Sequence, residues 1–451
     1  MPVAEAGSTD AAPPDPLTLL RSRGYLALLV MAALIGAPVS AAAFGFLALV
    51  GELQPLIYTD LPKALGFHGT PPWWPLPLLA VAGLLTALAV QYLPGHGGHE
   101  PTGGFKAGGT PEPIELPGIF FAALATLTFG AVLGPESPLL ALGGGLAAGA
   151  VRLVKRDPSK QVSAVMGAAG SFAAISSLLG SPLLGAFLLM EASGLGGQML
   201  ALVLVPGLLA SGIGALIFVG LGSWTGLGTY SLALHDVPKA TTPAVGEFGW
   251  ALVIGLAAAL AGVGVRWLAV RLKTYVERRR VWLTVGLGLV VAGLAIAYAE
   301  ATGKSATEVL YSGQTALDPL LTHGTTYSVG ALLLLALCKG LAYCASLSSF
   351  RGGPIFPAMF LGAAGGMAFS HLPGLSLVAG FAMGIGAMSA AMLGLPLVSV
   401  LLATLLIGSQ GLTVMPLVIV AVVVSYVASA KLTPPPAPEP GREETPSPQH
   451  P

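Results

Sequence analysis

Two short Gly-Pro motifs lie in very apolar parts of this chain, and their residue types suit anion binding. The first motif reads Gly-Pro-Glu-Ser-Pro over residues 134–138, and the second reads Gly-Pro-Ile-Phe-Pro over residues 353–357. Glycine permits a close approach of backbones, and proline fits the first helical turn, where its missing N–H costs nothing. Each motif therefore predicts a loop that opens into a helix. Because a helix N-terminus carries free amides and partial positive charge, the expected ligand is an anion.

The carboxylate in the first motif predicts a gate. Glu136 would occupy the same positive region as a passing anion. Two unit charges about 4 Å apart repel by roughly 1 kcal/mol in water and by roughly 4 kcal/mol at an effective dielectric near 20. Glu136 and the anion should therefore exclude each other, and protonation should open the path, which also makes Glu136 a candidate proton carrier. The alternative role is an ordinary acidic residue that stabilises a helix start.

The other residues of the two motifs have predicted roles in anion binding or in starting the helices. The expected backbone ligands of the anion are Gly134, Ser137, Gly353, Ile355 and Phe356. The prolines expected to start the two helices are Pro135, Pro138, Pro354 and Pro357.

Composition identifies an all-α polytopic membrane protein. Of its 451 residues, 54% are hydrophobic and 9% are charged, and the mean hydropathy is +0.82. A soluble protein carries about 25% charged residues. We therefore expect a multi-pass protein of the cell membrane (plasma or inner membrane) whose partner is the lipid bilayer. The formal net charge of zero gives no attraction to nucleic acid, and no metal site or cofactor is expected.

A second pair of matching segments indicates an internal repeat. Residues 181–184 read Ser-Pro-Leu-Leu and residues 395–398 read Leu-Pro-Leu-Val, each before an apolar run. The two pairs of motifs occur in the same order with a separation of about 215 residues, and such repeats in transporters are commonly inverted. The predicted segments are a disordered tail (1–18), a first membrane repeat (19–222), a connecting loop (223–244), a second membrane repeat (245–430) and a Pro-rich disordered tail (431–451).

These motifs resemble those of the CLC family of chloride channels and chloride/proton exchangers. That family has Gly-Lys/Arg-Glu-Gly-Pro, Gly-Gly-x-Phe-x-Pro and Gly-Ser-Gly-Ile-Pro where this chain has residues 134–138, 352–357 and 97–101. The resemblance covers most of residues 25–430 and implies an inverted repeat with tilted, broken and re-entrant helices. It also implies a homodimer with one pathway per subunit, carrying chloride or a related small anion and, in exchangers, protons.

Several positions depart from the family pattern. Gly98 stands where the family has an anion-coordinating serine, so Gly98 and His99 would offer only backbone groups to the anion. Ala192 aligns with the inner proton-carrying glutamate, which leaves Glu191 with either a proton role or a role in capping a helix. The pore tyrosine that follows the last span has no convincing counterpart near residues 431–434. These departures favour a passive or loosely coupled chloride pathway, with a proton-coupled chloride antiporter that uses an altered proton route as the alternative.

Two other classes of protein compete with this interpretation. An intramembrane serine hydrolase could use the serines of residues 346–349, but no histidine or acid is suitably placed within a span, so we expect no enzyme. A non-anion secondary transporter could bind a cation with Glu136 and Glu191, although the proline-led helix starts argue against cations. Arg351, beside the second motif, is either an electrostatic attractor of anions or an interfacial anchor.

Overall fold

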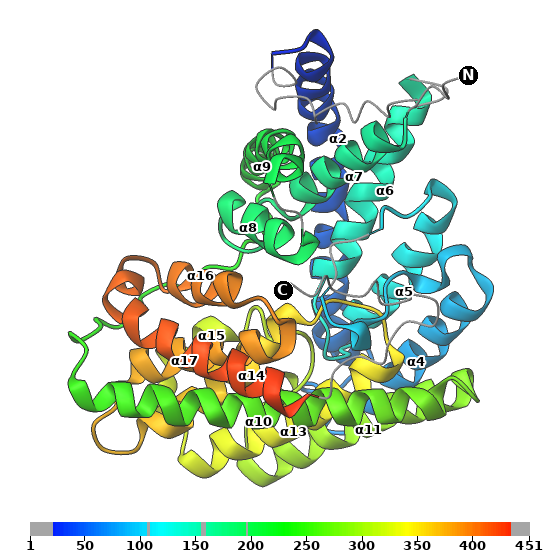
Figure 1. Ribbon diagram of the computed structural model, residues 1–451. Helices are drawn as coiled ribbons and strands as arrows, with labels where there is room; N and C mark the ends of the chain where they lie inside the picture. Colours follow the sequence, from blue (N-terminus) through cyan, green and yellow to red (C-terminus); the bar gives the residue numbers. More distant parts are fainter. Residues whose placement is uncertain (1–20, 106–108, 155–158, 195–196, 434–451) are drawn as a thin grey trace, which may run out of the picture.

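The structure is a computed structural model that describes residues 21–105, 109–154, 159–194 and 197–433 (Figure 1). The tail predicted over residues 1–18 lies outside the described residues, as does nearly all of the tail predicted over 431–451. At its start, that second prediction is wrong by two residues, because the last helix continues to Leu432.

Helices make up the regular structure of the described ranges, apart from one isolated bridge between two extended residues. The longer helices of the first half are α2 (Arg23–Pro55), α4 (Pro75–Tyr92), α5 (Leu116–Thr128), α6 (Glu136–Val154), α7 (Lys160–Ile175), α8 (Pro182–Ser193) and α9 (Gly197–Thr225). Those of the second half are α10 (Val245–Val276), α11 (Arg280–Thr302), α13 (Val329–Ser349), α14 (Ile355–Ser370), α15 (Leu377–Leu393), α16 (Pro396–Leu406) and α17 (Gly411–Leu432). The short helices are η1 (Leu56–Asp60), α3 (Leu61–Ala64), η2 (Pro94–Gly97), η3 (Pro101–Gly103), η4 (Pro113–Glu115), η5 (Ala306–Glu308), α12 (Leu317–Thr322), η6 (Gly324–Thr326) and η7 (Gly408–Gln410).

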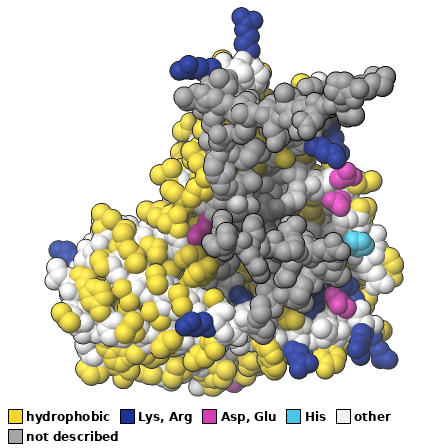
Figure 2. Space-filling model, viewed as in Figure 1, with side chains coloured by type: hydrophobic (Ala, Val, Ile, Leu, Met, Phe, Trp, Pro, Cys, Tyr) yellow, Lys and Arg dark blue, Asp and Glu magenta, His cyan; other side chains and the backbone are white. Residues whose placement is uncertain are grey.

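Helix lengths agree with the prediction of a polytopic protein with broken helices. Among the described residues, 8 helices are long and apolar enough to cross a membrane. Five further apolar segments have only 10–17 residues, less than the ~20 that a full span needs. The surface in Figure 2 is widely hydrophobic at the lower left, over α10, α16 and α17, with few charged side chains there. Half-length helices at membrane depth must be buried in protein or line an aqueous path, because lipid cannot satisfy their free backbone groups.

Local sequence explains where several of these helices start. The hydroxyl of Ser328 accepts a hydrogen bond from the amide of Ala331 at 3.2 Å and caps α13. Ser22 caps α2 in the same way through the amide of Tyr25, at 3.1 Å. Proline begins α4, α8 and α16, where its fixed φ suits the first turn.

The packing of the helices repeats between the two halves of the chain. In the first half α2 packs against α9, α6 against α7, and α8 against α9. In the second half α10 packs against α17, α14 against α15, and α16 against α17. Figure 1 shows α2, α6 and α7 crossing the direction of α10, α13 and α17 steeply. We propose from this correspondence that the repeat units are the two predicted halves, with α9 extending to Thr225 and α10 beginning at Val245.

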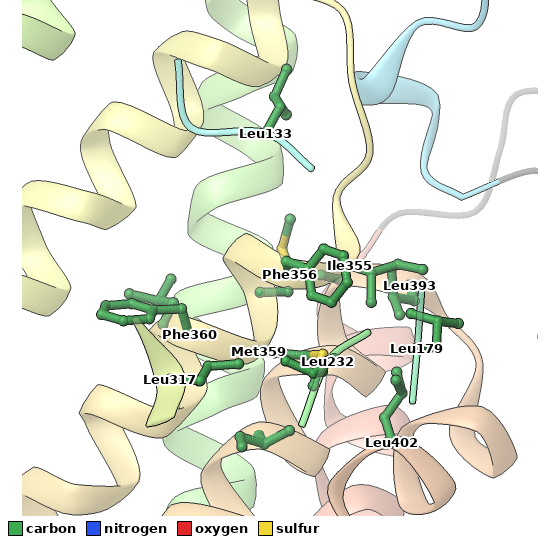
Figure 3. Packing of buried hydrophobic residues seen from close by; sticks show 14 of the residues in the cluster. Leu133, Leu179, Leu232, Leu317, Ile355, Phe356, Met359, Phe360, Leu393 and Leu402 are labelled. Atoms are coloured by element: carbon green, nitrogen blue, oxygen red, sulfur yellow. The ribbon is translucent and has the colours of Figure 1, made fainter. Parts of the chain in front are cut away.

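The second half contains the most tightly buried part of the core. Every residue from Ile355 to Ala364 in α14 is buried, and α15 is buried over nearly all of its length. The two helices approach so closely that a Cβ on Gly362 or Gly366 would collide with the backbone of α15. Figure 3 shows Ile355, Phe356, Met359 and Phe360 of α14 among other buried hydrophobic side chains. This packing fixes the start of α14, where the second motif lies.

Candidate anion site

The two Gly-Pro motifs lie side by side in the structure. The amide of Gly134 donates to the carbonyl of Gly353 at 2.8 Å, and the amide of Gly353 donates to the carbonyl of Gly134 at 2.6 Å. These two bonds form an antiparallel bridge between backbone segments 219 residues apart in the chain. α6 begins two residues after Gly134, and α14 begins two residues after Gly353. The bridge therefore places the two helix N-termini next to each other.

Backbone hydrogen bonds begin each helix within its motif. The carbonyl of Pro135 accepts the amide of Leu139, and the carbonyl of Pro354 accepts the amide of Ala358, so both helices are hydrogen-bonded from the motif onward. Pro138 and Pro357 lie in the first turns. Because most residues of the two motifs are buried, their polar groups need partners within the protein.

The carboxylate of Glu136 occupies the N-terminus of α14. Its Oε1 accepts a hydrogen bond from the amide of Phe356 at 2.8 Å, and the side chain is 0% exposed. Oε2 is buried and has no hydrogen-bond partner within the described ranges. An ionised carboxylate with one orphaned oxygen is costly to bury, by about 1–3 kcal/mol or more. A carboxyl group with one bonded oxygen can leave this position, or take up a proton, at a lower free-energy cost than one with both oxygens bonded.

Two glycines make room for this carboxylate. A Cβ on either Gly134 or Gly353 would collide with the carboxyl group of Glu136. The space between the two motifs is thus filled by a carboxyl group of the protein itself, held by an amide at a helix end. Ser137 is only partly buried, whereas Ile355 and Phe356 are 0% exposed.

The segment that was predicted as a third motif lies beside Arg351 rather than in contact with Glu136. Gly98 has a φ of +83° and lies against the side chain of Ile119. The ring of His99 hydrogen-bonds through Nε2 to the carbonyl of Gly104 at 3.2 Å. The predicted roles of Gly98 and His99 as anion ligands thus remain predictions.

Arg351 links the third motif to the second. Its side chain is 4% exposed, and its Nε donates to the carbonyl of His96 at 3.3 Å. Its Nη2 lies 3.5 Å from Oε1 of Glu100, whose other carboxylate oxygen pairs with Lys273 of α10. This burial rules out the predicted role of Arg351 as an interfacial anchor. Although partial burial opposes it, the hydrogen bond from Lys273 and the charge of Arg351 hold the pKa of Glu100 below its ordinary value.

Comparison with known proteins identifies the family. The family model described as "Voltage gated chloride channel" matches residues 78–430. The chain belongs to this family. The relative named "Putative ion-transport protein YfeO" from Salmonella schwarzengrund is 28% identical over 360 residues, covering 77% of this chain and 81% of its own length. The protein of the same name from Escherichia fergusonii is 28% identical over 368 residues, covering 78% and 81%.

Solved structures of this family share the fold. A slow cyanobacterial Cl⁻/H⁺ antiporter superposes with a TM-score of 0.71 and 17% identity over 90% of this chain and 94% of that one. A CLC-type fluoride/proton antiporter gives a TM-score of 0.67 and 18% identity over 90% and 96%. The predicted CLC resemblance and the predicted fold are therefore confirmed, as is membership of a family of anion-transport proteins.

Two roles were open for Glu191, in proton transfer or in capping a helix. In the structure its carboxylate caps a helix. Its Oε1 accepts the amide of Leu397 at 3.0 Å, and its Oε2 accepts the amide of Val398 at 2.8 Å. These amides belong to the first turn of α16. Both oxygens are thus bonded, in contrast with Glu136. Ala192 lies next to Glu191 and contributes to the lining of a separate cavity between α7, α8 and α9.

Sequence reasoning missed the contacts that three polar residues of α13 make with the site or its surroundings. The hydroxyl of Tyr343 donates to the carbonyl of Pro354 at 2.8 Å. The hydroxyl of Ser346 accepts the amide of Val132 at 3.0 Å, so this candidate hydrolase serine has a structural contact. Lys339 lies one turn before Tyr343. A lysine in the middle of an apolar span was the signal that could have drawn attention to this helix.

Proposed function

We propose that this protein carries chloride or a related small anion across the cell membrane between the N-termini of α6 and α14. The observation that carries the proposal is the Glu136 carboxylate bound to the amide of Phe356. A carboxylate there indicates that this space suits a monovalent anion, since the same amide and the same helix dipole would stabilise chloride. Moderate binding by backbone groups suits transport, because the ion must also leave.

Glu136 acts as the gate in this proposal. While its carboxylate occupies the space between Gly134 and Gly353, an anion cannot bind there. Protonation removes the charge that is attracted to the N-terminus of α14, so the side chain is released and the anion takes its place. Low pH therefore opens the pathway.

A proton-coupled antiporter is the second candidate, and the unbonded Oε2 of Glu136 favours it. A buried carboxyl oxygen without a partner is a suitable proton acceptor. Against tight coupling, Glu191 has both oxygens engaged with amides of α16, and Ala192 cannot carry a proton. We therefore favour a passive or loosely coupled pathway.

Simultaneous recording of anion and proton flux tests these proposals. Purified protein in liposomes should release chloride down its gradient, faster at acidic pH, with no fixed accompanying proton movement. A constant ratio of protons to anions would instead establish the antiporter, and sodium-dependent transport without anion movement would refute both. Parallel measurements with fluoride and nitrate would rank the anions.

Membership of the family supports two further proposals, on assembly and on location. We propose a homodimer with one pathway in each subunit, located in the plasma or inner membrane. Mass measurement of the detergent-solubilised protein tests the first point, because a monomeric mass would contradict it. Membrane fractionation tests the second.

A further inference from the structure

One face of α13 carries three buried polar side chains. Lys339, Tyr343 and Ser346 are spaced by four and three residues, so they follow one another along one side of the helix. Their exposed fractions are 1%, 1% and 0%. Burial of polar groups in an apolar span is costly unless each group is bonded. The bonds that these groups make therefore indicate what the face does.

Tyr343 and Ser346 hold the two motifs that form the gate. The bond from Tyr343 to the carbonyl of Pro354 fixes the turn before α14. The bond from the amide of Val132 to Ser346 fixes the segment that leads to Gly134. Each of the two backbone segments that form the bridge is thus hydrogen-bonded to α13 close to Glu136.

Lys339 holds a third backbone segment. Its ammonium group lies within hydrogen-bond distance of four consecutive carbonyls, those of residues 308 to 311, at 3.0, 3.1, 3.0 and 3.2 Å. An ammonium group has three donors, so the four carbonyls share them. The ring of Phe360 in α14 completes the surroundings, with its centroid 4.4 Å from Nζ. The four carbonyls and the ring thus form a cation-binding site, and the ammonium group of Lys339 occupies it.

The segment held by Lys339 is hydrogen-bonded to the segment that precedes the first motif. The amide of Tyr311 donates to the carbonyl of Gly130 at 3.1 Å, four residues before Gly134. Tyr311 has a φ of +57°, an unfavourable conformation for a residue with a Cβ, so the surrounding contacts must hold it. Its ring also lies edge-to-face with that of Tyr58 at 5.5 Å, and Tyr58 donates to the carbonyl of Phe129 at 2.8 Å. On the other side Gly313 lies against Phe360.

The other charged groups beside this segment, Glu308 and Lys304, have different partners. Lys339 is therefore the cation that binds the four carbonyls. The carboxylate of Glu308 accepts hydrogen bonds from Tyr298 at 2.5 Å and from Tyr327 at 3.1 Å. Lys304 lies over the ring of Tyr327, 3.7 Å from its centroid. Glu308 thus contributes its carbonyl to Lys339 while its carboxylate is bound by the two phenols.

We propose that Lys339 is a positioning residue for the gate, whose ammonium group holds residues 308–311 and, through Tyr311 and Gly130, sets the geometry of the first motif. This inference rests on the proposed gating role of Glu136. A neutral side chain of the same size would fill the space but would leave four carbonyls, two of them on fully buried residues, without this donor. The segment would then lose its fixed conformation, and the place occupied by Glu136 would loosen.

The pH profile of transport tests this proposal. Lys339→Met should lower chloride efflux from liposomes by about tenfold or more, as expected for loss of a hydrogen-bonded charged group, and should move the midpoint of pH activation to higher pH. The matched control is Lys304→Met, which removes a lysine near the same segment that does not bind the four carbonyls, and it should leave both quantities unchanged. A folded Lys339→Met protein with wild-type efflux and midpoint would overturn the proposal.

Chemical rescue separates the charge from the shape. Lys339→Ala should recover efflux when propylammonium, which has the atoms removed from the side chain, is added, and it should not recover with 1-propanol. Equal recovery with the alcohol, or recovery with neither compound, would show that the carbonyl site does not require an ammonium group and would refute the inference.

Hydrogen exchange keeps the inference testable if these variants transport too poorly to measure. In detergent, the amides of Tyr311, Gly134 and Gly353 should exchange faster in Lys339→Met than in the wild type. Unchanged exchange at these amides would refute the positioning role. If instead Glu136→Gln left the pH dependence of transport intact, the gate itself would be wrong, while the exchange data would still report on Lys339.

Discussion

The carboxylate of Glu136 accepts a hydrogen bond from the amide of Phe356, and this one contact joins the first helical turns of α6 and α14. A helix N-terminus attracts negative charge, and here the charge comes from the opposing helix. Because the carboxyl group of Glu136 fills the space that the motif glycines leave, we propose that it and an anion are alternative occupants of one position. The gating behaviour of the protein should therefore depend on the charge and size of the groups at this place.

Neutralising Glu136 should remove the pH dependence of transport. In Glu136→Gln the side chain keeps its size but no longer competes with an anion through its charge. Relief of even ~1.4 kcal/mol of repulsion would raise chloride efflux about tenfold at alkaline pH, where the wild type is closed. Efflux from liposomes across a range of pH measures this.

The appropriate control is Glu191→Gln, which alters the other carboxylate at a helix N-terminus and should retain the wild-type pH profile. A folded Glu136→Gln protein that remained as pH-sensitive as the wild type would exclude Glu136 as the gate.

Filling the space beside Glu136 should have a related effect. In Gly353→Ala the new methyl group would collide with the carboxylate of Glu136, so the side chain must leave the N-terminus of α14. We expect chloride efflux that is largely independent of pH, and no further change in pH dependence when Glu136→Gln is added.

Gly365→Ala in the same helix is the matched control, because a Cβ there meets no atom within 4 Å. Retention of the full wild-type pH profile in Gly353→Ala would mean that the carboxylate does not need the space which the glycine leaves.

The sequence predicted the paired helix starts because glycine and proline act through local backbone geometry. It also indicated Glu136 as a candidate gate, because an acidic residue is unusual in an apolar segment. The contacts of Lys339, Tyr343 and Ser346 could not be predicted, because each joins α13 to a loop that is distant or whose path depends on the whole fold. The Glu100 pair with Lys273 escaped notice for the same reason, as 173 residues separate its members.

Removing Glu191 should weaken the second half without changing transport. Glu191→Ala deletes the acceptor for the amides of Leu397 and Val398, so α16 loses its N-terminal cap. The expected cost is about 1 kcal/mol in the free energy of unfolding, with Glu191→Gln less affected because it keeps one acceptor oxygen. Denaturant unfolding in detergent measures the stability, and proteoliposome recording measures the fluxes. An altered proton-to-anion ratio at unchanged stability would assign Glu191 to a proton route instead.

The ion pairs of Glu100 should make stability depend on pH with a defined sign. The folded protein holds the pKa of Glu100 below its ordinary value, so the ionised form is the one that folding favours. The stabilisation is therefore full above the ordinary pKa and is lost as the pH falls through the lowered one. Glu100→Gln should lower the melting temperature at neutral pH, because the buried Arg351 loses its nearest carboxylate. The difference from the wild type should shrink below about pH 4, where the wild-type residue also becomes neutral. A difference that stayed constant or grew on acidification would show that Glu100 acts through packing and not through its charge.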